Sequence, residues 1–66
     1  MALAPARADR PTGLDLKLRR VELGISQTRL AARMGLSRQR VTQVEVTMWP
    51  TDAMTRRYLA ALGDLA

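Results

Sequence analysis

Apolar residues recur along the chain at the spacing of amphipathic helices, in four stretches separated by glycine, serine, threonine or proline. The first stretch begins at Thr12, which has the capping-box spacing with Asp15, and it ends at Gly24. The alternation over residues 14–18 also fits a strand, but the flanking residues favour a helix. Two apolar faces predict that this helix is packed on more than one side; they comprise Leu16 and Leu23 on one face, and Leu14, Leu18 and Val21 on the other.

The second and third helices are predicted to meet at a tight turn. Ser26 is placed to cap a helix that runs through Ala32, with Leu30 and Met34 facing inward. Gly35 then supplies a left-handed residue, and the apolar Leu36 follows it as a capping contact. Ser37 caps the next helix at once, and that helix carries Val41 and Val44 on its inner face.

The fourth helix is predicted to start after Pro50 and Thr51 and to stop at Gly63. Its inward residues are Met54, Tyr58, Leu59 and Leu62. The pattern therefore predicts an all-α fold, a compact bundle of four or at most five short helices that includes a helix-turn-helix. We expect two parts, a flexible N-terminal arm over residues 1–11 and a folded helix-turn-helix domain over residues 12–66.

The composition argues against an enzyme. The chain has 66 residues, enough for a single domain, and it contains no Cys and no His. It therefore lacks the commonest metal ligands and the commonest general base, and its six acidic residues are scattered. We expect no catalytic residue, no metal and no cofactor. No apolar run is long enough to span a bilayer and the start of the chain has no secretion signal, so we expect a cytoplasmic protein without a membrane partner.

The charge balance indicates a polyanionic partner. Lys and Arg number 11 against six acidic residues, which gives a net charge of +5, and ten of the eleven are Arg. A general bias toward arginine would give the same count. The positions of the arginines therefore have to distinguish a polyanionic partner from a composition bias. Four of them lie between Ser26 and Glu45, a segment with a single acid.

The outer face of the third helix has the side chains that direct readout of base pairs needs. Arginine pairs with guanine O6 and N7, and glutamine pairs with adenine N6 and N7. Simple solvation is the alternative for a polar helix face, but it does not explain the small Ala31 at the helix crossing or the glycine turn. The face presents six side chains, none of them acidic: Ser37, Arg38, Gln39, Arg40, Thr42 and Gln43.

At these positions the chain resembles the lambda-repressor-like, or Cro and xenobiotic-response-element, helix-turn-helix family. The resemblance covers roughly residues 14–63. The residues that carry it match the family pattern without a gap: Gly24-Ile25-Ser26-Gln27, Leu30-Ala31, Gly35-Leu36-Ser37, Val41 and Val44-Glu45.

The resemblance implies a role for each polar residue. Gln27 would contact a backbone phosphate, and Ser37 and Arg40 would lie nearer the DNA backbone or the groove wall. Arg20 and Glu45 hold the positions of a partly buried ion pair that joins the first and third helices, which is a structural role. The side chains implied to face base edges are Arg38, Gln39, Thr42 and Gln43.

The segment after Glu45 departs from the family pattern. Family members usually continue with a polar or basic residue, a glycine and a basic loop, whereas this chain has an apolar loop over residues 46–50. Burial of this loop in the core is the favoured interpretation. The alternative is a protein interface, because Trp and Met are enriched there; its candidate residues are Met48, Trp49, Pro50 and Tyr58.

These observations predict a transcriptional regulator, a repressor that binds double-stranded DNA at an inverted-repeat operator as a homodimer. Monomeric, weaker binding is left open by the sequence. A second hypothesis is an antitoxin-type or adaptor protein that binds a toxin or another partner protein and represses its own operon. A third is sequence-tolerant DNA binding driven by charge. The arm over residues 1–11 is expected to be a frayed terminus, with a minor-groove contact as the alternative.

Overall fold

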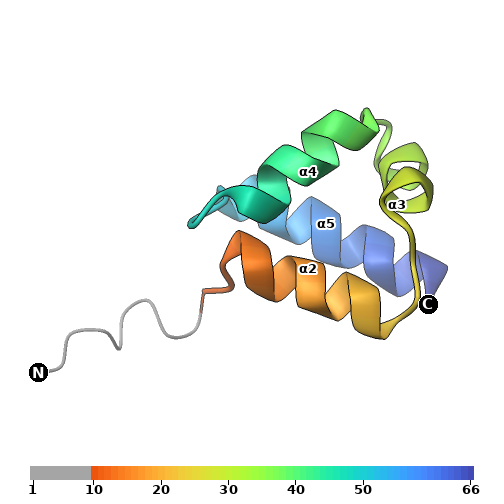
Figure 1. The fold of residues 1–66 in the computed structure, drawn as a ribbon, viewed down its shortest axis with the longest axis horizontal. Helices are drawn as coiled ribbons and strands as arrows, with labels where there is room; N and C mark the ends of the chain where they lie inside the picture. Colours follow the sequence, from red (N-terminus) through yellow and green to blue (C-terminus); the bar gives the residue numbers. More distant parts are fainter. Residues whose placement is uncertain (1–9) are drawn as a thin grey trace, which may run out of the picture.

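Four helices make up the regular structure of residues 10–66, the part of the chain that the computed structural model describes (Figure 1). They are α2 (Gly13–Glu22), α3 (Gln27–Met34), α4 (Arg38–Val46) and α5 (Asp52–Leu65). Helices α3 and α4 form the helix-turn-helix, and α2 and α5 pack beneath them. The prediction of a compact all-α fold is confirmed.

Every predicted N-cap forms. The Thr12 hydroxyl accepts from the Asp15 backbone N–H at 3.1 Å, and the Asp15 carboxylate accepts from the Thr12 N–H at 2.9 Å, which completes the capping box of α2. Ser26 and Ser37 accept from the backbone N–H three residues later, at the starts of α3 and α4. Thr51 caps α5 in the same way. These caps determine where each helix begins.

The two predicted glycine turns also form. Gly24 and Gly35 have φ values of +72° and +71°, the left-handed conformation that a side chain disfavours. After each glycine, an apolar residue returns its N–H to the helix that has just ended: Ile25 to the Arg20 carbonyl at 3.2 Å, and Leu36 to the Ala31 carbonyl at 2.9 Å. The second turn sets the angle at which α4 leaves α3.

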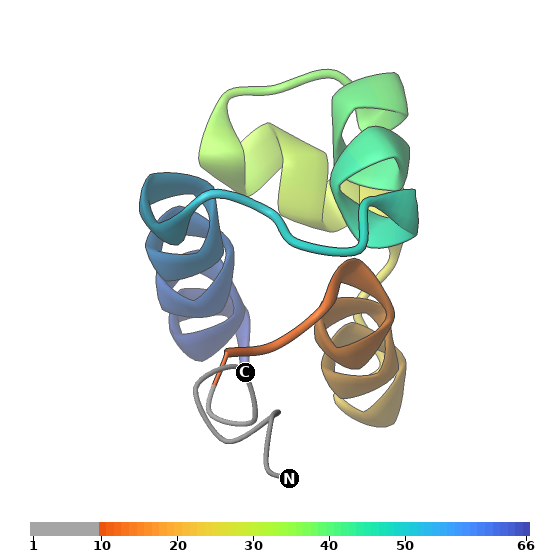
Figure 2. The same ribbon diagram turned by 90° about the vertical axis from the view of Figure 1, so that its left-hand side faces the viewer.

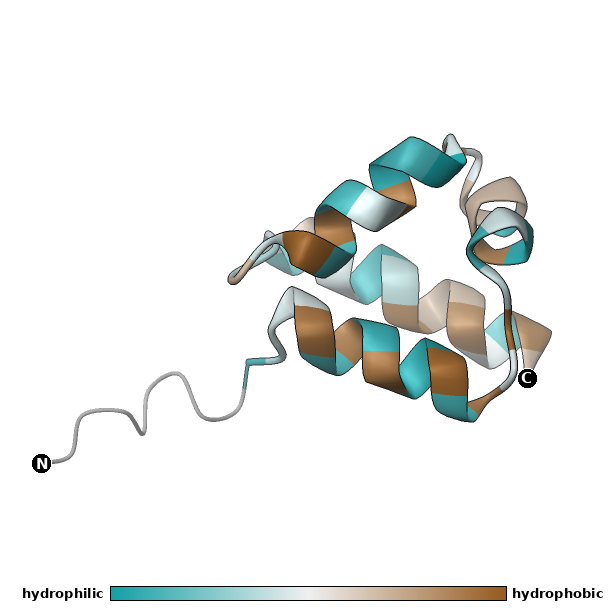
Figure 3. Ribbon diagram, viewed as in Figure 1, coloured by the Kyte–Doolittle hydropathy of each residue, from teal (hydrophilic) through white to brown (hydrophobic). Residues whose placement is uncertain are grey.

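One apolar core lies between the four helices, and hydropathy mapped on the ribbon shows hydrophobic bands on each of them (Figure 3). The predicted inward residues of α3, α4 and α5 are in it or packed against it. The largest fully buried side chains are Tyr58, Leu16, Leu30, Leu62 and Val41.

The prediction that α2 is packed on both apolar faces is wrong for the described chain. Leu16 is buried, whereas the second face, formed by Leu14, Leu18 and Val21, is exposed. Leu23, assigned to the same face as Leu16, is exposed as well. The second face stays exposed because helices α4 and α5 both pack against α2 on the side of Leu16.

Two helix ends also differ from the predictions. Helix α3 continues two residues past Ala32, to Met34. Helix α5 does not stop at Gly63 but continues to Leu65. Gly63 stays helical instead of taking a positive φ, and the half-buried Leu65 packs against the core. The packing of Leu65 therefore favours continuation of the helix over an end at Gly63.

A close backbone contact joins the start of α2 to the end of α4, where the segment between α4 and α5 crosses over α2 (Figure 2). The Gly13 N–H donates to the Thr47 carbonyl oxygen at 2.9 Å. A Cβ atom on Gly13 would lie 2.4 Å from the carbonyl oxygens of both Thr47 and Val44. Glycine is therefore required at this position by space, a constraint that the sequence pattern did not reveal.

Gly13→Ala should lower the free energy of unfolding by about 1–3 kcal/mol, because backbone has to move to admit the methyl group. Gly63→Ala is the matched control: nothing lies within 4 Å of its Cβ position, and alanine at this helical site should stabilise the protein by about 0.5 kcal/mol. Chemical denaturation measures both. Equal stability of the two variants would contradict the close contact.

Candidate nucleic-acid interface

The outer face of α4 presents the predicted DNA-contacting residues together. All six side chains are exposed: Ser37, Arg38, Gln39, Arg40, Thr42 and Gln43. They line one shallow depression with Val46, which is 77% exposed. Val41, Val44 and Glu45 form the opposite, buried side of the helix. The structure thus brings the six together, and Val46 at the end of this face is an addition that sequence reasoning missed.

A buried ion pair holds α4 against α2. Arg20 Nε donates to Glu45 Oε2 at 2.7 Å, and Arg20 Nη2 donates to Glu45 Oε1 at 3.2 Å, so the contact is bidentate. The third guanidinium nitrogen donates to the Ile25 carbonyl at 2.8 Å, at the turn between α2 and α3. Arg20 is 8% exposed and Glu45 is 5% exposed. The two residues form the pair that the family resemblance implied.

Tyr58 is buried beside Arg20 and Glu45, and these three residues form the buried cluster of the domain. The Tyr58 hydroxyl donates to Glu45 Oε2 and also lies 3.2 Å from the Leu16 carbonyl oxygen. The side chain is fully buried, at 0% exposed. The prediction that Tyr58 contributes to an exposed protein interface is therefore wrong, because the hydroxyl is needed inside as a donor to the carboxylate.

Gln27 links the buried cluster to the outer face of α4. Its Nε2 donates to Glu45 Oε1 at 2.9 Å, and its Oε1 lies 3.2 Å from the Thr42 hydroxyl. The Thr42 hydroxyl has a second acceptor within reach, the Arg38 carbonyl, also at 3.2 Å. One N–H of the Gln27 amide is left by these contacts. The phosphate contact of Gln27 stays a prediction, and the structure adds a positioning role.

The cluster shifts the ionisation of its members. Burial alone would raise the pKa of Glu45, but hydrogen bonds from Arg20, Tyr58 and Gln27 outweigh burial and lower it. The hydrogen bond to Glu45 raises the pKa of Arg20. Burial, followed by the hydrogen bond to the carboxylate, raises the pKa of Tyr58. The carboxylate is therefore held in its charged form while the tyrosine stays protonated.

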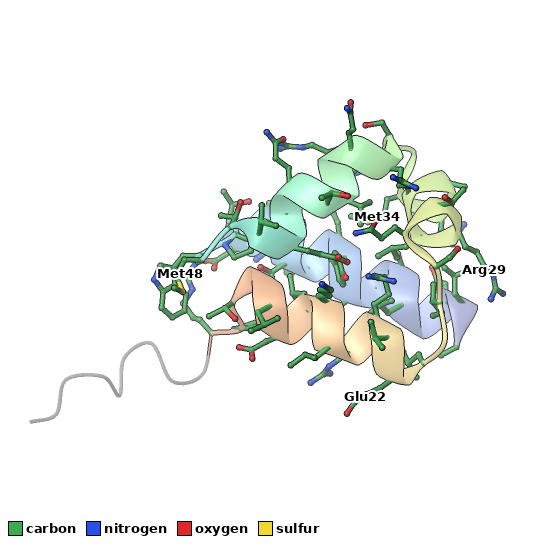
Figure 4. The ribbon with its side chains drawn as sticks, in the orientation of Figure 1. Glu22, Arg29, Met34 and Met48 are labelled. Atoms are coloured by element: carbon green, nitrogen blue, oxygen red, sulfur yellow. The ribbon has the colours of Figure 1, made fainter. Side chains whose placement is uncertain are left out.

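The segment between α4 and α5 is only partly buried. Pro50 is buried, but Trp49 is 37% exposed and Met48 is 64% exposed. Met48 lies at the end of the molecule where α4 gives way to α5 (Figure 4). The favoured prediction, burial of this loop in the core, is therefore wrong for Met48 and incomplete for Trp49. The exposed pair lies directly beyond the end of the outer face of α4.

Part of the predicted N-terminal arm lies outside the described residues, which begin at Arg10. Arg10 Nη2 donates to the Pro50 carbonyl at 3.3 Å and lies 3.1 Å from Asp52 Oδ1. Arg10 therefore contacts the same segment that precedes α5. In residues 10–66, no helix is long and apolar enough to cross a membrane.

Comparison with known families agrees with this geometry. A family model described as helix-turn-helix matches residues 16–63, more than half of the chain. The protein therefore belongs to the helix-turn-helix family of the lambda-repressor and Cro type, a family of DNA-binding regulators and not of enzymes. No curated protein and no solved structure matches the chain.

Tyr58→Phe tests the buried cluster through its pH dependence. The lowered pKa of Glu45 means that its contribution to stability is present above the unfolded value of 4.5 and is lost as the pH falls through the folded value. Removing the hydroxyl should lower the free energy of unfolding by about 1.5–3 kcal/mol near neutral pH, because the bond goes to a charged acceptor. That loss should shrink at acid pH, as the pH falls below 4.5 and through the lowered pKa of Glu45, because the carboxylate then becomes neutral.

The control is Asp64→Asn, which breaks an exposed ion pair with Arg33 at 2.6 Å. Because both partners are about half exposed, the loss should stay within about 1 kcal/mol. Denaturation curves at several pH values measure both variants. A Tyr58→Phe loss that is the same at neutral and acid pH would contradict the assigned hydrogen bond to the Glu45 carboxylate.

Proposed function

We propose that the protein is a transcriptional repressor that binds an inverted-repeat operator in double-stranded DNA as a homodimer, with α4 in the major groove. The observation that carries this proposal is the exposed outer face of α4, whose six polar side chains include two arginines and two glutamines and no acid. These are the side chains that distinguish base pairs by hydrogen bonding in the major groove. Hydrophilic residues dominate the start of α4 (Figure 3).

The place of each polar residue in α3 or α4 indicates whether it would contact a base or a phosphate. Arg38, Gln39 and Gln43 contact base edges, since recognition helices use their N-terminal residues for readout. Ser37 and the first backbone N–H groups of α4 lie where a helix N-terminus attracts phosphate. Gln27, at the start of α3, has one amide N–H available for a second phosphate. Contacts to phosphate position the protein, and contacts to bases provide specificity.

The buried cluster makes the interface rigid before DNA arrives. Arg20 fixes α4 to α2 through Glu45, and Gln27 fixes α4 to α3. A recognition helix that is already held in place loses less conformational entropy on binding. A net charge of +5 adds attraction to the DNA backbone, so binding should weaken steeply with salt.

The dimer contact is assigned to Met48 and Trp49. These are exposed apolar side chains beside the recognition face, and both residue types are enriched in interface cores. A two-fold contact there would place two α4 helices on one side of the DNA, as an inverted repeat requires. Such a dimer, acting in the cytoplasm, would repress by covering the promoter.

A second candidate function uses the same exposed residues differently. Met48 and Trp49 would bind a toxin or another partner protein, as in an antitoxin or adaptor that also represses its own operon. A partner that co-purifies with the natural chain and is lost with Met48→Glu would favour this function. A stable dimer of the purified chain that dissociates with Met48→Glu would favour the homodimer.

Selection of binding sites from a randomised duplex pool, at near-physiological salt, tests the proposed function. We expect an enriched inverted repeat, which also reports that two subunits bind. Arg38→Ala should cost about 1–3 kcal/mol, concentrated at one base position. Arg19→Ala removes the same charge from α2, where Arg19 lines a depression with Asp15 and Leu59, away from α4, and it should leave the preferred sequence unchanged.

The other outcomes separate the alternatives. Enrichment of a single half-site would indicate a monomer. Equal weakening of all sequences by Arg38→Ala, with no enriched site, would leave only sequence-tolerant binding driven by charge and would contradict the proposed function.

A further inference from the structure

Two residues of the recognition face are already hydrogen-bonded to each other. Arg40 Nη1 donates to Gln43 Oε1 at 3.1 Å. The residues are three apart in α4, a spacing that places side chains next to each other on one side of a helix. Both side chains are exposed on the face assigned to the major groove.

This bond fixes the direction of the Gln43 amide. A glutamine amide has one acceptor oxygen and one nitrogen with two N–H donors, whereas a guanidinium has donors only. Only the amide oxygen can therefore face Arg40, since the opposite orientation would bring donor against donor. The Gln43 nitrogen, with both of its N–H groups, is left for the DNA.

No neighbouring carboxylate competes for Arg40 within α4. Glu45 is the one acid in this helix, and it is buried. Its oxygens accept from Arg20, Tyr58 and Gln27, as described above. The other exposed charged residue of α4 is Arg38, which repels Arg40 and offers it no acceptor.

The direction of the amide decides which base it fits. Adenine presents the N7 acceptor beside the N6 donor, so a glutamine must offer both its oxygen and its nitrogen to pair with it. Guanine presents two adjacent acceptors, N7 and O6. The Gln43 oxygen keeps a second lone pair, but the Arg40 cation beside it favours the two acceptors of guanine over the N6 donor of adenine, which carries a partial positive charge.

We propose that Arg40 sets the base preference of Gln43, so that Gln43 selects guanine where an unpaired glutamine would select adenine. Arg40 is in this respect a positioning residue for specificity, and not only a cation near the phosphate backbone. The inference rests on the proposed function, because it requires α4 to lie in the major groove.

The test measures base preference in four variants. Gln43→Ala identifies the base that Gln43 contacts, as the position whose preference is relaxed. At that position the natural chain should prefer guanine over adenine by about tenfold, which corresponds to about 1.4 kcal/mol. Arg40→Met, which cannot donate, should reverse the preference to adenine. Arg40→Lys retains a donor and should keep guanine.

Arg38→Met is the matched control, because it removes the same charge from the same helix but leaves the Arg40–Gln43 bond in place. It should change the preference at its own base and not at the base of Gln43. Thermal unfolding of each variant checks that the fold is kept, which we expect because the substituted side chains are exposed.

Two results would overturn the inference. The first is a natural chain that prefers adenine at the base identified by Gln43→Ala. The second is an Arg40→Met variant that binds every sequence more weakly, with a smaller salt dependence but an unchanged preference, since that would make Arg40 a phosphate contact. If the natural chain selects no sequence at all, the proposed function itself fails, which is a separate and recognisable outcome.

Discussion

The buried Glu45 carboxylate is the group on which the rest of the structure depends. It accepts hydrogen bonds from residues of α2, α3 and α5, while it belongs to α4 itself. A single charge thus fixes all four helices relative to one another. Burying it is costly unless every lone pair is used, and here Arg20, Gln27 and Tyr58 supply the donors. Replacing one partner would leave a charge buried without its full set of hydrogen bonds.

The hydrogen bonds around Glu45 also connect the buried core to the outer face of α4. The same Gln27 amide that donates to Glu45 also lies beside Thr42 on the outer face of α4. The outer face of α4 is therefore held from beneath by a hydrogen-bonded network and not only by apolar packing. A helix held in this way suits the proposed readout of base pairs, because a loosely held helix would adjust to any of them. Rigidity also limits the entropy lost on binding.

Local signals in the sequence predicted most of the fold, because caps, glycine turns and helical periodicity act over a few residues. They identified the N-caps, both left-handed glycines and the polar face of α4. What they missed depends on contacts between distant residues: the space around Gly13, the hydrogen bond from the Tyr58 hydroxyl to Glu45 and the exposed second face of α2. Leu65 extended α5 past Gly63 for the same reason, because its packing partners come from elsewhere in the fold.

The central claim is that the outer face of α4 contacts the bases. Chemical-shift mapping by NMR of the labelled protein, titrated with its selected duplex, tests it most directly. We expect the largest changes at the side-chain amides of Gln39 and Gln43 and at the backbone amides of residues 37–43. The exposed apolar face of α2, at residues 14–21, should change little. Large changes on α2, with α4 unaffected, would contradict the account.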